Sequence, residues 1–466
     1  MHEIDYVIFI SYFLAIIYVG YYFLKKNQSR DDYYVGGRSI KASHVGLSIA
    51  ATDVGGGFSI GLGGLGFTMG LAGSWLLFTG LVGAWMAAVF TVPKLKKLDI
   101  EVGLLTFPDF LRLKYNRSVG SLAAVISAIG YVGFTAGQIL AGGKLASASV
   151  FNEITWIDPL TFSLVVMSLV VIIYTSMGGI KAVIYTDTIQ WIVLLSGLLL
   201  LGIPFAYLKL GGWDVIQASL PSSHLSLVNI SWVTVMNWSF AIIPIWFIAM
   251  TLYQRVYSTK NVAEAKKAFF IAGIFEYPLM AFAGVILGML ARVAFPESEA
   301  ETALPLMLSD VLPLGIAGFV LAAYFSAVMS TADSCLIAAS GNVENDLLGG
   351  LSKRKIAPVY WSVLVTVVLG VVSFLLATWF TKVLDIVLQS YAFMVSGLLV
   401  PTLAAYFTRR PSTKGAIVSM VGGGGLTLIL IFLQTPMPYG LDPTIFGISA
   451  STVLYFLTKV VLTNDV

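Results

Sequence analysis

Residues 46–58 read Gly-Leu-Ser-Ile-Ala-Ala-Thr-Asp-Val-Gly-Gly-Gly-Phe, and they lie inside an apolar segment that runs from 43 to 69. Residues 55–73 contain nine glycines. Glycine in a helix interior costs about 1 kcal/mol relative to alanine, so three in a row predict local unwinding of a helix. Unwound backbone at membrane depth must be buried in protein or line a polar cavity. The alternative is that the glycines only let two helices pack closely, although packing motifs space their small residues.

The composition of the whole chain is that of a membrane protein. Of its 466 residues, 58% are hydrophobic and only 11% are charged, whereas soluble domains carry about 25% charged residues. Lipid must therefore cover much of the surface. A formal net charge of +3 gives no reason to expect a nucleic-acid partner, and the single cysteine, Cys335, excludes an intramolecular disulfide. The three histidines are scattered, so the sequence indicates no metal-ligand cluster and no metal other than sodium, discussed below.

About thirteen apolar segments are long enough to cross a bilayer as helices, because the hydrocarbon core needs about 20 residues. They lie at 4–24, 43–69, 72–93, 119–147, 157–177, 183–207, 232–253, 268–292, 312–341, 357–380, 383–407, 415–434 and 443–461. The expected fold is therefore an all-α membrane protein with about 13 transmembrane helices. No soluble domain can be separated from it, so residues 1–466 form a single transmembrane domain. In the long loop at 94–118, residues 105–111 predict a short helix on the membrane surface.

The basic residues orient these segments. If the N-terminus is outside, 23 of the 27 lysines and arginines fall on the inner side, and only Lys144, Lys209, Arg292 and Lys382 fall outside. Basic residues concentrate in cytoplasmic loops. The sequence therefore predicts a multi-pass protein of the cell membrane with an external N-terminus and a cytoplasmic C-terminus.

A second helix break is expected in segment 232–253, where Pro244 removes a backbone hydrogen bond. A purely structural role is an equally good interpretation of Pro244 alone. The two breaks lie five segments apart, and five is odd, so the two groups of five helices have opposite orientations. This is the pattern of an inverted repeat whose broken helices meet near the midplane to bind substrate and ion. The predicted repeats are 43–207 and 232–408, with peripheral helices at 4–24 and 415–461.

An ion site is indicated in residues 326–334, which read Ser-Ala-Val-Met-Ser-Thr-Ala-Asp-Ser. Positions 327, 330, 331 and 334 share one helix face. The Ser330 and Thr331 hydroxyls and a freed Ala327 carbonyl offer the oxygen ligands that hard cations prefer. The alternative is that these hydroxyls only hydrogen-bond to their own helix.

Four carboxylates fall within the apolar segments, where a charge is expensive: Asp53, Asp187, Glu276 and Asp333. Asp187 lies about two turns from the cytoplasmic surface, so an ion ligand and a solvated interfacial charge are equally consistent with its position. Glu276 lies beside Tyr277 and Pro278, and the sequence assigns it no role.

Several ordered segments resemble the sodium:solute symporter family, which includes sodium/proline, sodium/sugar, pantothenate and sialic acid transporters. The resemblance covers essentially the whole chain. It rests on residues 31–39, 46–58, 106–111, 174–190, 254–255 and 327–334. It implies a leucine-transporter-like fold of five plus five inverted helices with peripheral helices, an architecture that is known for such transporters.

The resemblance also implies ion ligands. The main sodium site would use the carbonyls of Ala51, Val54 and Ala327 and the hydroxyls of Ser330 and Thr331. Some members carry a second sodium, which here would be bound near Asp187 with Ser330, Asp333 and Ser334. In the member that best shows this second site, the residue matching Asp333 is a serine, so the stoichiometry of one or two sodium ions stays open.

The solute is expected between the helices at 43–69, 72–93, 119–147, 232–253, 268–292 and 383–407. Candidate solute-binding residues are Asp53, Gly55, Gly56, Phe58, Phe78, Gln138, Trp246 and Gln389. Where some sugar transporters have a polar group, this chain has Phe58, which favours an amino acid or a small carboxylate over a sugar.

The resulting hypothesis is a secondary active transporter that couples uptake of a small polar organic solute to sodium by alternating access. It would need no cofactor besides Na⁺ and would function as a monomer. The alternatives are a proton-coupled symporter and an uncoupled facilitator or channel; few buried carboxylates and many hydroxyls favour sodium. A transporter-like sensor would usually carry an appended signalling domain, and the chain ends shortly after the segment at 443–461. An enzyme is not expected, because no nucleophile–base pair is visible.

Overall fold

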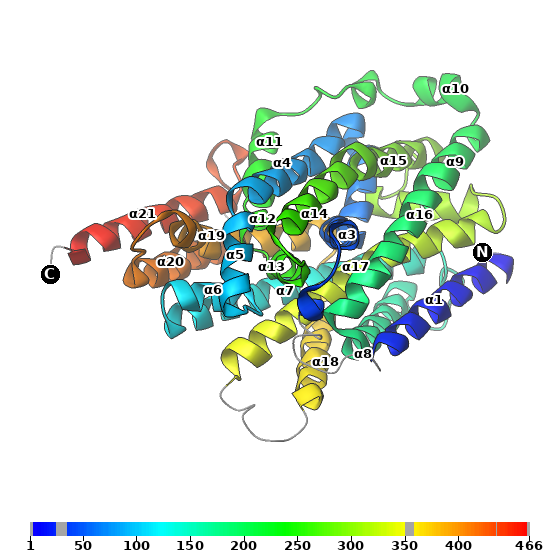
Figure 1. The fold of residues 1–466 in the computed structure, drawn as a ribbon. Helices are drawn as coiled ribbons and strands as arrows, with labels where there is room; N and C mark the ends of the chain where they lie inside the picture. Colours follow the sequence, from blue (N-terminus) through cyan, green and yellow to red (C-terminus); the bar gives the residue numbers. More distant parts are fainter. Residues whose placement is uncertain (1–2, 25–34, 350–357, 435, 464–466) are drawn as a thin grey trace.

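The computed structural model describes residues 3–24, 35–349, 358–434 and 436–463, which form a bundle of tilted helices (Figure 1). Within these residues the only β-type contact is one isolated bridge between Ile40 and Thr259. The helices of the first half are α1 (Glu3–Leu24), η1 (Gly36–Arg38), α3 (Ala42–Met69), η2 (Gly70–Ser74), α4 (Trp75–Phe90), α5 (Val92–Val102), α6 (Phe107–Lys114), α7 (Arg117–Ala148), α8 (Pro159–Leu195), η3 (Ser196–Gly202), α9 (Ile203–Lys209), α10 (Gly212–Ser219) and η4 (Ser222–Leu225).

The helices of the second half are α11 (Trp232–Ile242), α12 (Ile245–Ile248), α13 (Met250–Ser258), α14 (Val262–Ile274), η5 (Phe275–Ala281), α15 (Phe282–Ala294), α16 (Ala300–Asp310), α17 (Ile316–Gly341), η6 (Asn342–Leu347), α18 (Pro358–Ala377), α19 (Val383–Phe407), α20 (Thr413–Phe432), η7 (Pro438–Gly440) and α21 (Pro443–Thr463). The described residues contain nine helices long and apolar enough to cross a membrane, or ten with one bent pair. Each of the thirteen predicted segments coincides with helix, but the number that span the membrane stays a prediction.

The short helix expected at 105–111 is present as α6. Its N-cap residue, Thr106, accepts a hydrogen bond from the Asp109 backbone N–H, as capping threonines do at the start of a helix. In Figure 1, α6 and α10 lie on opposite sides of the bundle. This arrangement agrees with the predicted placement of their two loops on opposite sides of a membrane.

The predicted break in α3 occurs at Gly55, whose backbone angles (φ 46°, ψ −175°) are not helical. Close packing, the alternative interpretation, is also present. A Cβ atom on Gly55 would lie 2.1 Å from Thr331 Oγ1, and one on Gly56 would lie 2.1 Å from Val328 Cγ2. The absence of side chains therefore lets α3 both unwind and approach α17.

The second break lies further along the chain than Pro244, where the sequence predicted it. α11 ends at Ile242, before Pro244, but the extended residue is Ala249 (φ −68°, ψ 117°) between α12 and α13. The segments Trp232–Ile248 and Met250–Ser258 meet at an angle of 42°. No proline or glycine occupies position 249, so the sequence carried no signal for it.

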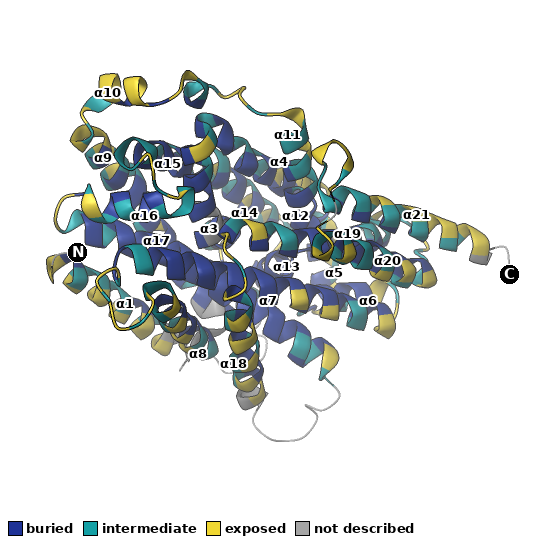
Figure 2. Ribbon diagram, turned by 180° about the vertical axis from the view of Figure 1, so that it is seen from behind, coloured by how far each residue is buried: buried dark blue, intermediate teal, exposed yellow. Residues whose placement is uncertain are grey.

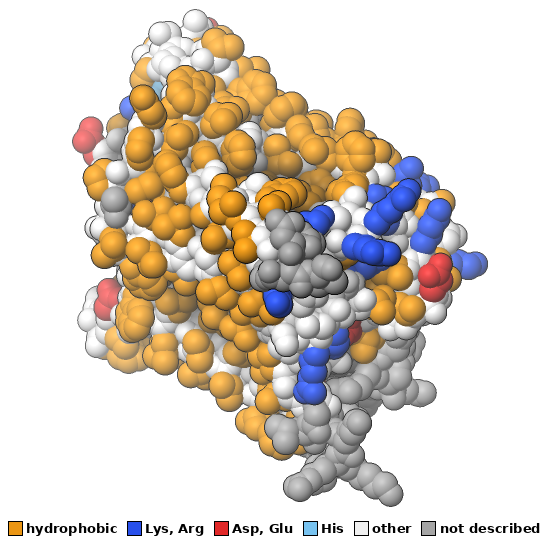
Figure 3. Space-filling model, turned by 90° about the vertical axis from the view of Figure 1, so that its left-hand side faces the viewer, with side chains coloured by type: hydrophobic (Ala, Val, Ile, Leu, Met, Phe, Trp, Pro, Cys, Tyr) orange, Lys and Arg blue, Asp and Glu red, His pale blue; other side chains and the backbone are white. Residues whose placement is uncertain are grey.

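The centre of the bundle is α17, whose apolar stretch is entirely buried against α3, α7 and α8. Figure 2 shows it dark blue along its length, whereas α1, α18 and α21 expose one face. In Figure 3, hydrophobic side chains cover most of the visible face and lysines and arginines gather toward one edge. This distribution suits a lipid-covered belt with a basic rim.

Candidate ion and solute site

The first polar cluster lies where α17 crosses α3, just before the Gly55 break. The Ser330 hydroxyl donates toward the carbonyls of Ala51 and Ala327, each 3.1 Å away. The Thr331 hydroxyl donates toward Ala51, at 3.2 Å, and Thr52, at 3.0 Å. Ser330 and Thr331 are fully buried. Two hydroxyls and three carbonyls therefore converge in one water-excluded place.

This geometry is consistent both with hydroxyls that bond to their own helix and with hydroxyls that serve as ion ligands. Ser330 does hydrogen-bond within its own helix, to Ala327, but both hydroxyls also reach across to α3. Val54 is buried beside the break. Among the described residues, neither hydroxyl bonds to the Val54 carbonyl, whereas Thr331 does reach the Thr52 carbonyl, which sequence reasoning did not include.

The second cluster surrounds the Arg255 side chain, which extends from α13 and is fully buried. Its Nη2 atom lies 3.1 Å from Asp187 Oδ2 and 2.9 Å from Ser334 Oγ. Further bonds go to the hydroxyls of Ser48 and Thr52. Ser48 in turn donates to Asp187, at 2.5 Å. A guanidinium thus occupies the polar space next to Asp187.

This cluster changes two expectations from the sequence. The predicted topology places Arg255 in a cytoplasmic loop, as one of the 23 inner basic residues, but it lies in the core of the bundle. Asp187 is fully buried and ion-paired, so it is not a solvated interfacial charge. The signal that could have identified the pair was weak, because the two residues are 68 positions apart.

Asp333 lies behind this ion pair and is fully buried. Its carboxylate interacts with Ser334 and lies close enough to Asp187 and Arg255 to interact electrostatically with both. Ser334 links the two clusters, because its hydroxyl donates to the Ser330 carbonyl, at 2.9 Å, and approaches Thr52 Oγ1, at 3.1 Å. The candidate ion ligands therefore form one connected network.

The structure brings only some of the candidate solute-binding residues together. Asp53, Gly55 and Gly56 share the α3 break. Trp246, on α12, packs against α4, where a Cβ atom on Gly83 would lie 2.3 Å from its indole ring. Gln138 is fully buried in α7. Contacts join α3 to α7 and α12 to α4.

Three other candidates lie elsewhere or cannot be placed. Phe78 is half-buried and forms ring contacts with Trp75 and Tyr277, with centroids 4.9 and 5.0 Å apart. Gln389 lines a separate pocket between α19 and the residues before α21, so it does not join the group at the α3 break. The Phe58 side chain lies outside the described part of the structure.

A small cavity adjoins the α3 break. Its lining includes Asp53, Tyr391 and Phe134, together with Thr52, Tyr131, Ala249, Thr251, Leu252 and Cys335. Its volume of about 10 Å³ holds about one water molecule. The site is closed around polar groups in this conformation.

Comparison with known proteins identifies the family. A family model described as the sodium:solute symporter family matches residues 33–423, most of the chain. The chain belongs to this family. It is 26% identical to the high-affinity proline transporter PutP of Bacillus subtilis, over 96% of this chain and 95% of that protein. It is 25% identical to the sodium/sialic acid symporter SiaT of Proteus mirabilis, over 81% of this chain and 78% of that protein.

Solved structures confirm the fold. The structure of a Na⁺-coupled sialic acid symporter matches with a TM-score of 0.80 at 23% identity and covers 98% of each chain. A nucleobase-cation-symport-1 family transporter matches with a TM-score of 0.61 at 13% identity, over 93% of this chain and 96% of that one. The predicted all-α, leucine-transporter-like fold is confirmed. The protein is a multi-pass membrane transporter for sodium-coupled solute symport and not an enzyme.

Proposed function

We propose that the protein carries an amino acid or a small carboxylate into the cell together with sodium bound where α3 crosses α17. The supporting observation is the convergence of the Ser330 and Thr331 hydroxyls on the carbonyls of α3 beside the Gly55 break. Together with Ala51, Val54 and Ala327, these groups supply about the number of oxygens that a small hard cation needs.

The location suits coupling as well as binding. An ion held by carbonyls of α3 and hydroxyls of α17 would tie the two helices together, and the α3 break is where solute is expected in a repeat transporter. The relatives named above carry proline and sialic acid. Uptake by a monomer with its N-terminus outside completes the proposal, in which residues 43–207 and 232–408 are the two inverted repeats.

A second sodium at Asp187, Asp333 and Ser334 has one observation in favour and one against. Asp333 carries a fully buried carboxylate, a negative charge that a cation would stabilise. The Arg255 guanidinium, however, already neutralises Asp187 and contacts Ser334. We therefore expect one sodium per solute while Arg255 keeps this position.

Proton movement alongside sodium is the second candidate. It is favoured by the four buried carboxylates Asp53, Asp187, Glu276 and Asp333, since buried acids can carry protons across a membrane. The test is uptake into proteoliposomes of a panel of amino acids, carboxylates and sugars. A sodium gradient and a proton gradient are applied separately, with choline replacing sodium. Uptake that follows the proton gradient and ignores sodium would refute the sodium proposal.

A further inference from the structure

Two buried carboxylates outside the ion clusters face the same small space beside α4. Asp53 lies on α3 two residues before the Gly55 break, and Glu276 lies in η5, the π-helical turn between α14 and α15. A Cβ atom on Gly80 of α4 would lie 2.5 Å from Glu276 Oε2 and 3.9 Å from Asp53 Oδ2. Because residue 80 is a glycine, there is space beside α4 for both carboxylates.

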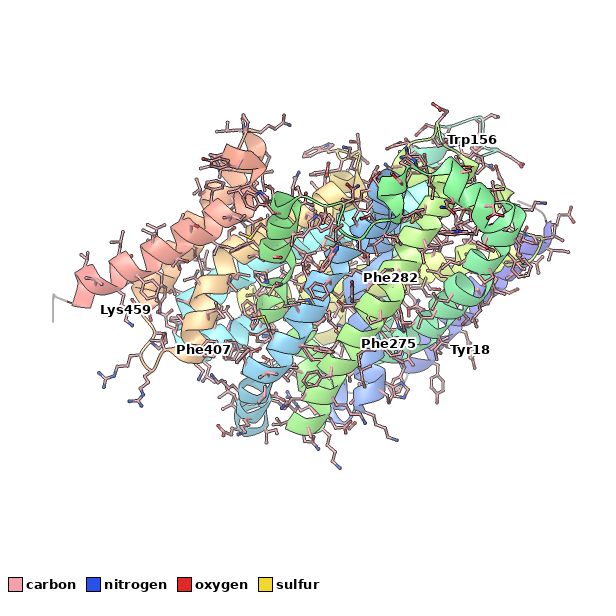
Figure 4. All side chains as sticks on the ribbon, turned by 90° about the horizontal axis from the view of Figure 1, so that it is seen from above. Tyr18, Trp156, Phe275, Phe282, Phe407 and Lys459 are labelled. Atoms are coloured by element: carbon pink, nitrogen blue, oxygen red, sulfur yellow. The ribbon has the colours of Figure 1, made fainter. Side chains whose placement is uncertain are left out.

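Glu276 is held in this position by an irregular turn. Pro278 lies inside η5 and cannot donate a backbone hydrogen bond, and π-helical turns are frequent at functional sites. Phe275 and Phe282, labelled in Figure 4, bracket the turn on successive helical segments. Glu276 is fully buried in this turn, although a carboxylate at this depth is costly.

The negative charges of Asp53 and Glu276 are not balanced by nearby positive charges in the described structure. Neither oxygen of Glu276 accepts a hydrogen bond, and within the described residues no lysine or arginine pairs with Glu276 or Asp53. Asp53 accepts one hydrogen bond, from Tyr391. Two uncompensated buried charges repel each other and strongly destabilise a fold. A cationic group or protons must therefore neutralise the pair.

The surroundings favour an organic cation. Tyr391 stacks on Phe134, with ring centroids 4.9 Å apart. Trp246 lies against Gly83, one turn from Gly80 on the same face of α4, and its indole N–H has no hydrogen-bond partner among the residues that the structure describes. Aromatic faces and carboxylates are the groups that bind ammonium ions. Sodium already has the separate oxygen cluster at Ser330 and Thr331.

We propose that Asp53 and Glu276 form a subsite for a protonated amine of the transported solute. This inference rests on the proposed function and narrows it: an amine-bearing solute, zwitterionic or cationic, suits the pair, whereas a sugar or a carboxylate without an amine does not. Asp53 contacts the amine, and the ion cluster fixes the turn of α3 that carries Asp53. Glu276, in η5, supplies the second negative charge.

The test measures binding to the purified full-length protein in lipid nanodiscs by calorimetry, in sodium and in potassium. The probes are L-proline, L-lysine and putrescine, with glucose, N-acetylneuraminate and pyruvate as solutes without a protonated amine. At least one amine should bind, and Glu276→Gln should weaken its binding by at least tenfold. Gly80→Ala should weaken it as well, because the methyl group would collide with the Glu276 carboxylate.

The matched control is Glu344→Gln, which removes a buried carboxylate that accepts a hydrogen bond from Ser362 on α18, away from this subsite. Its amine affinity should equal that of the unaltered protein, and its folding shows how the protein tolerates the loss of a buried carboxylate outside the subsite. Binding of only the solutes that lack an amine, unchanged affinity in Glu276→Gln, or no amine binding at all would overturn the inference. Amine binding that is lost in Glu276→Gln but ignores sodium would support the subsite and refute sodium coupling.

Discussion

The sodium site is most directly tested by removing the Ser330 and Thr331 hydroxyls. Ser330→Ala deletes one oxygen shared between the Ala51 and Ala327 carbonyls, and Thr331→Val deletes another while keeping the side-chain shape. A lost buried polar contact costs about 1–3 kcal/mol. Each variant should therefore bind sodium about five- to 150-fold more weakly.

The assay is binding of radioactive sodium to the purified protein, which does not require the solute to be known. Ser326→Ala is the matched control: this hydroxyl is equally buried on α17 but bonds to the Ala322 carbonyl and to Tyr12 of α1 instead of to α3. Its sodium affinity should not change. If the curves of all three variants coincide with that of the unaltered protein, the hydroxyls only stabilise the helices and the site assignment is wrong.

The double variant adds information that the single variants cannot give. Both hydroxyls reach the same Ala51 carbonyl, 3.1 and 3.2 Å away, so their contributions are coupled. Neighbouring groups that share a partner depart from additivity by about 0.5–3 kcal/mol. The double variant should therefore lose less sodium affinity than the two single losses together. Strict additivity would indicate that the hydroxyls do not share one ion.

Three further predictions concern other parts of the molecule. Asp187→Asn leaves the buried Arg255 charge unpaired, so thermal stability should fall and the sodium concentration for half-maximal uptake should rise; an unchanged sodium dependence would contradict a role in the ion network. With cysteines placed singly at Ser222 and Lys260 in a cysteine-free background, an impermeant thiol reagent outside intact cells should label only position 222; the opposite pattern would invert the predicted topology. Burial holds the pKa of His224 below its usual value. Unfolding therefore takes up a proton in acid, and the unfolding temperature should drop between about pH 7 and about pH 5, less so in His224→Gln; equal pH profiles would exclude this histidine as the cause.

The sequence predicted the features that depend on local pattern. Three consecutive glycines indicated the α3 break, which the structure shows at Gly55. The spacing of Ser330 and Thr331 placed both hydroxyls on one face of α17, as observed. Glycine content and helical periodicity are properties of a few adjacent residues, so both can be recognised in a single sequence.

The features that were missed depend on contacts between distant segments. The Arg255 side chain turns into the core because it donates hydrogen bonds to Asp187, Ser48 and Ser334, which lie on three other helices. The break at Ala249 has no glycine or proline to mark it. Gln389 points into a pocket near α21 because of how α19 rotates against its neighbours, which hydrophobicity does not determine. Long-range packing decides each of these cases.

Ion and amine recognition can be coupled because they use one turn of α3. The Ala51 and Thr52 carbonyls meet the α17 hydroxyls, and the next residue, Asp53, faces Glu276 across Gly80. The Gly55 break removes helical support directly after this turn, so its geometry depends on what binds to it. A sodium ion that fixes the Ala51 and Val54 carbonyls, on either side of Asp53, would also fix the Asp53 carboxylate for an amine. Because coupling between two ligands is reciprocal, a bound amine should tighten sodium by the same factor as sodium tightens the amine. Ser330→Ala and Glu276→Gln should each abolish this mutual increase in affinity, although Ser330 contacts the sodium ion and Glu276 contacts the amine.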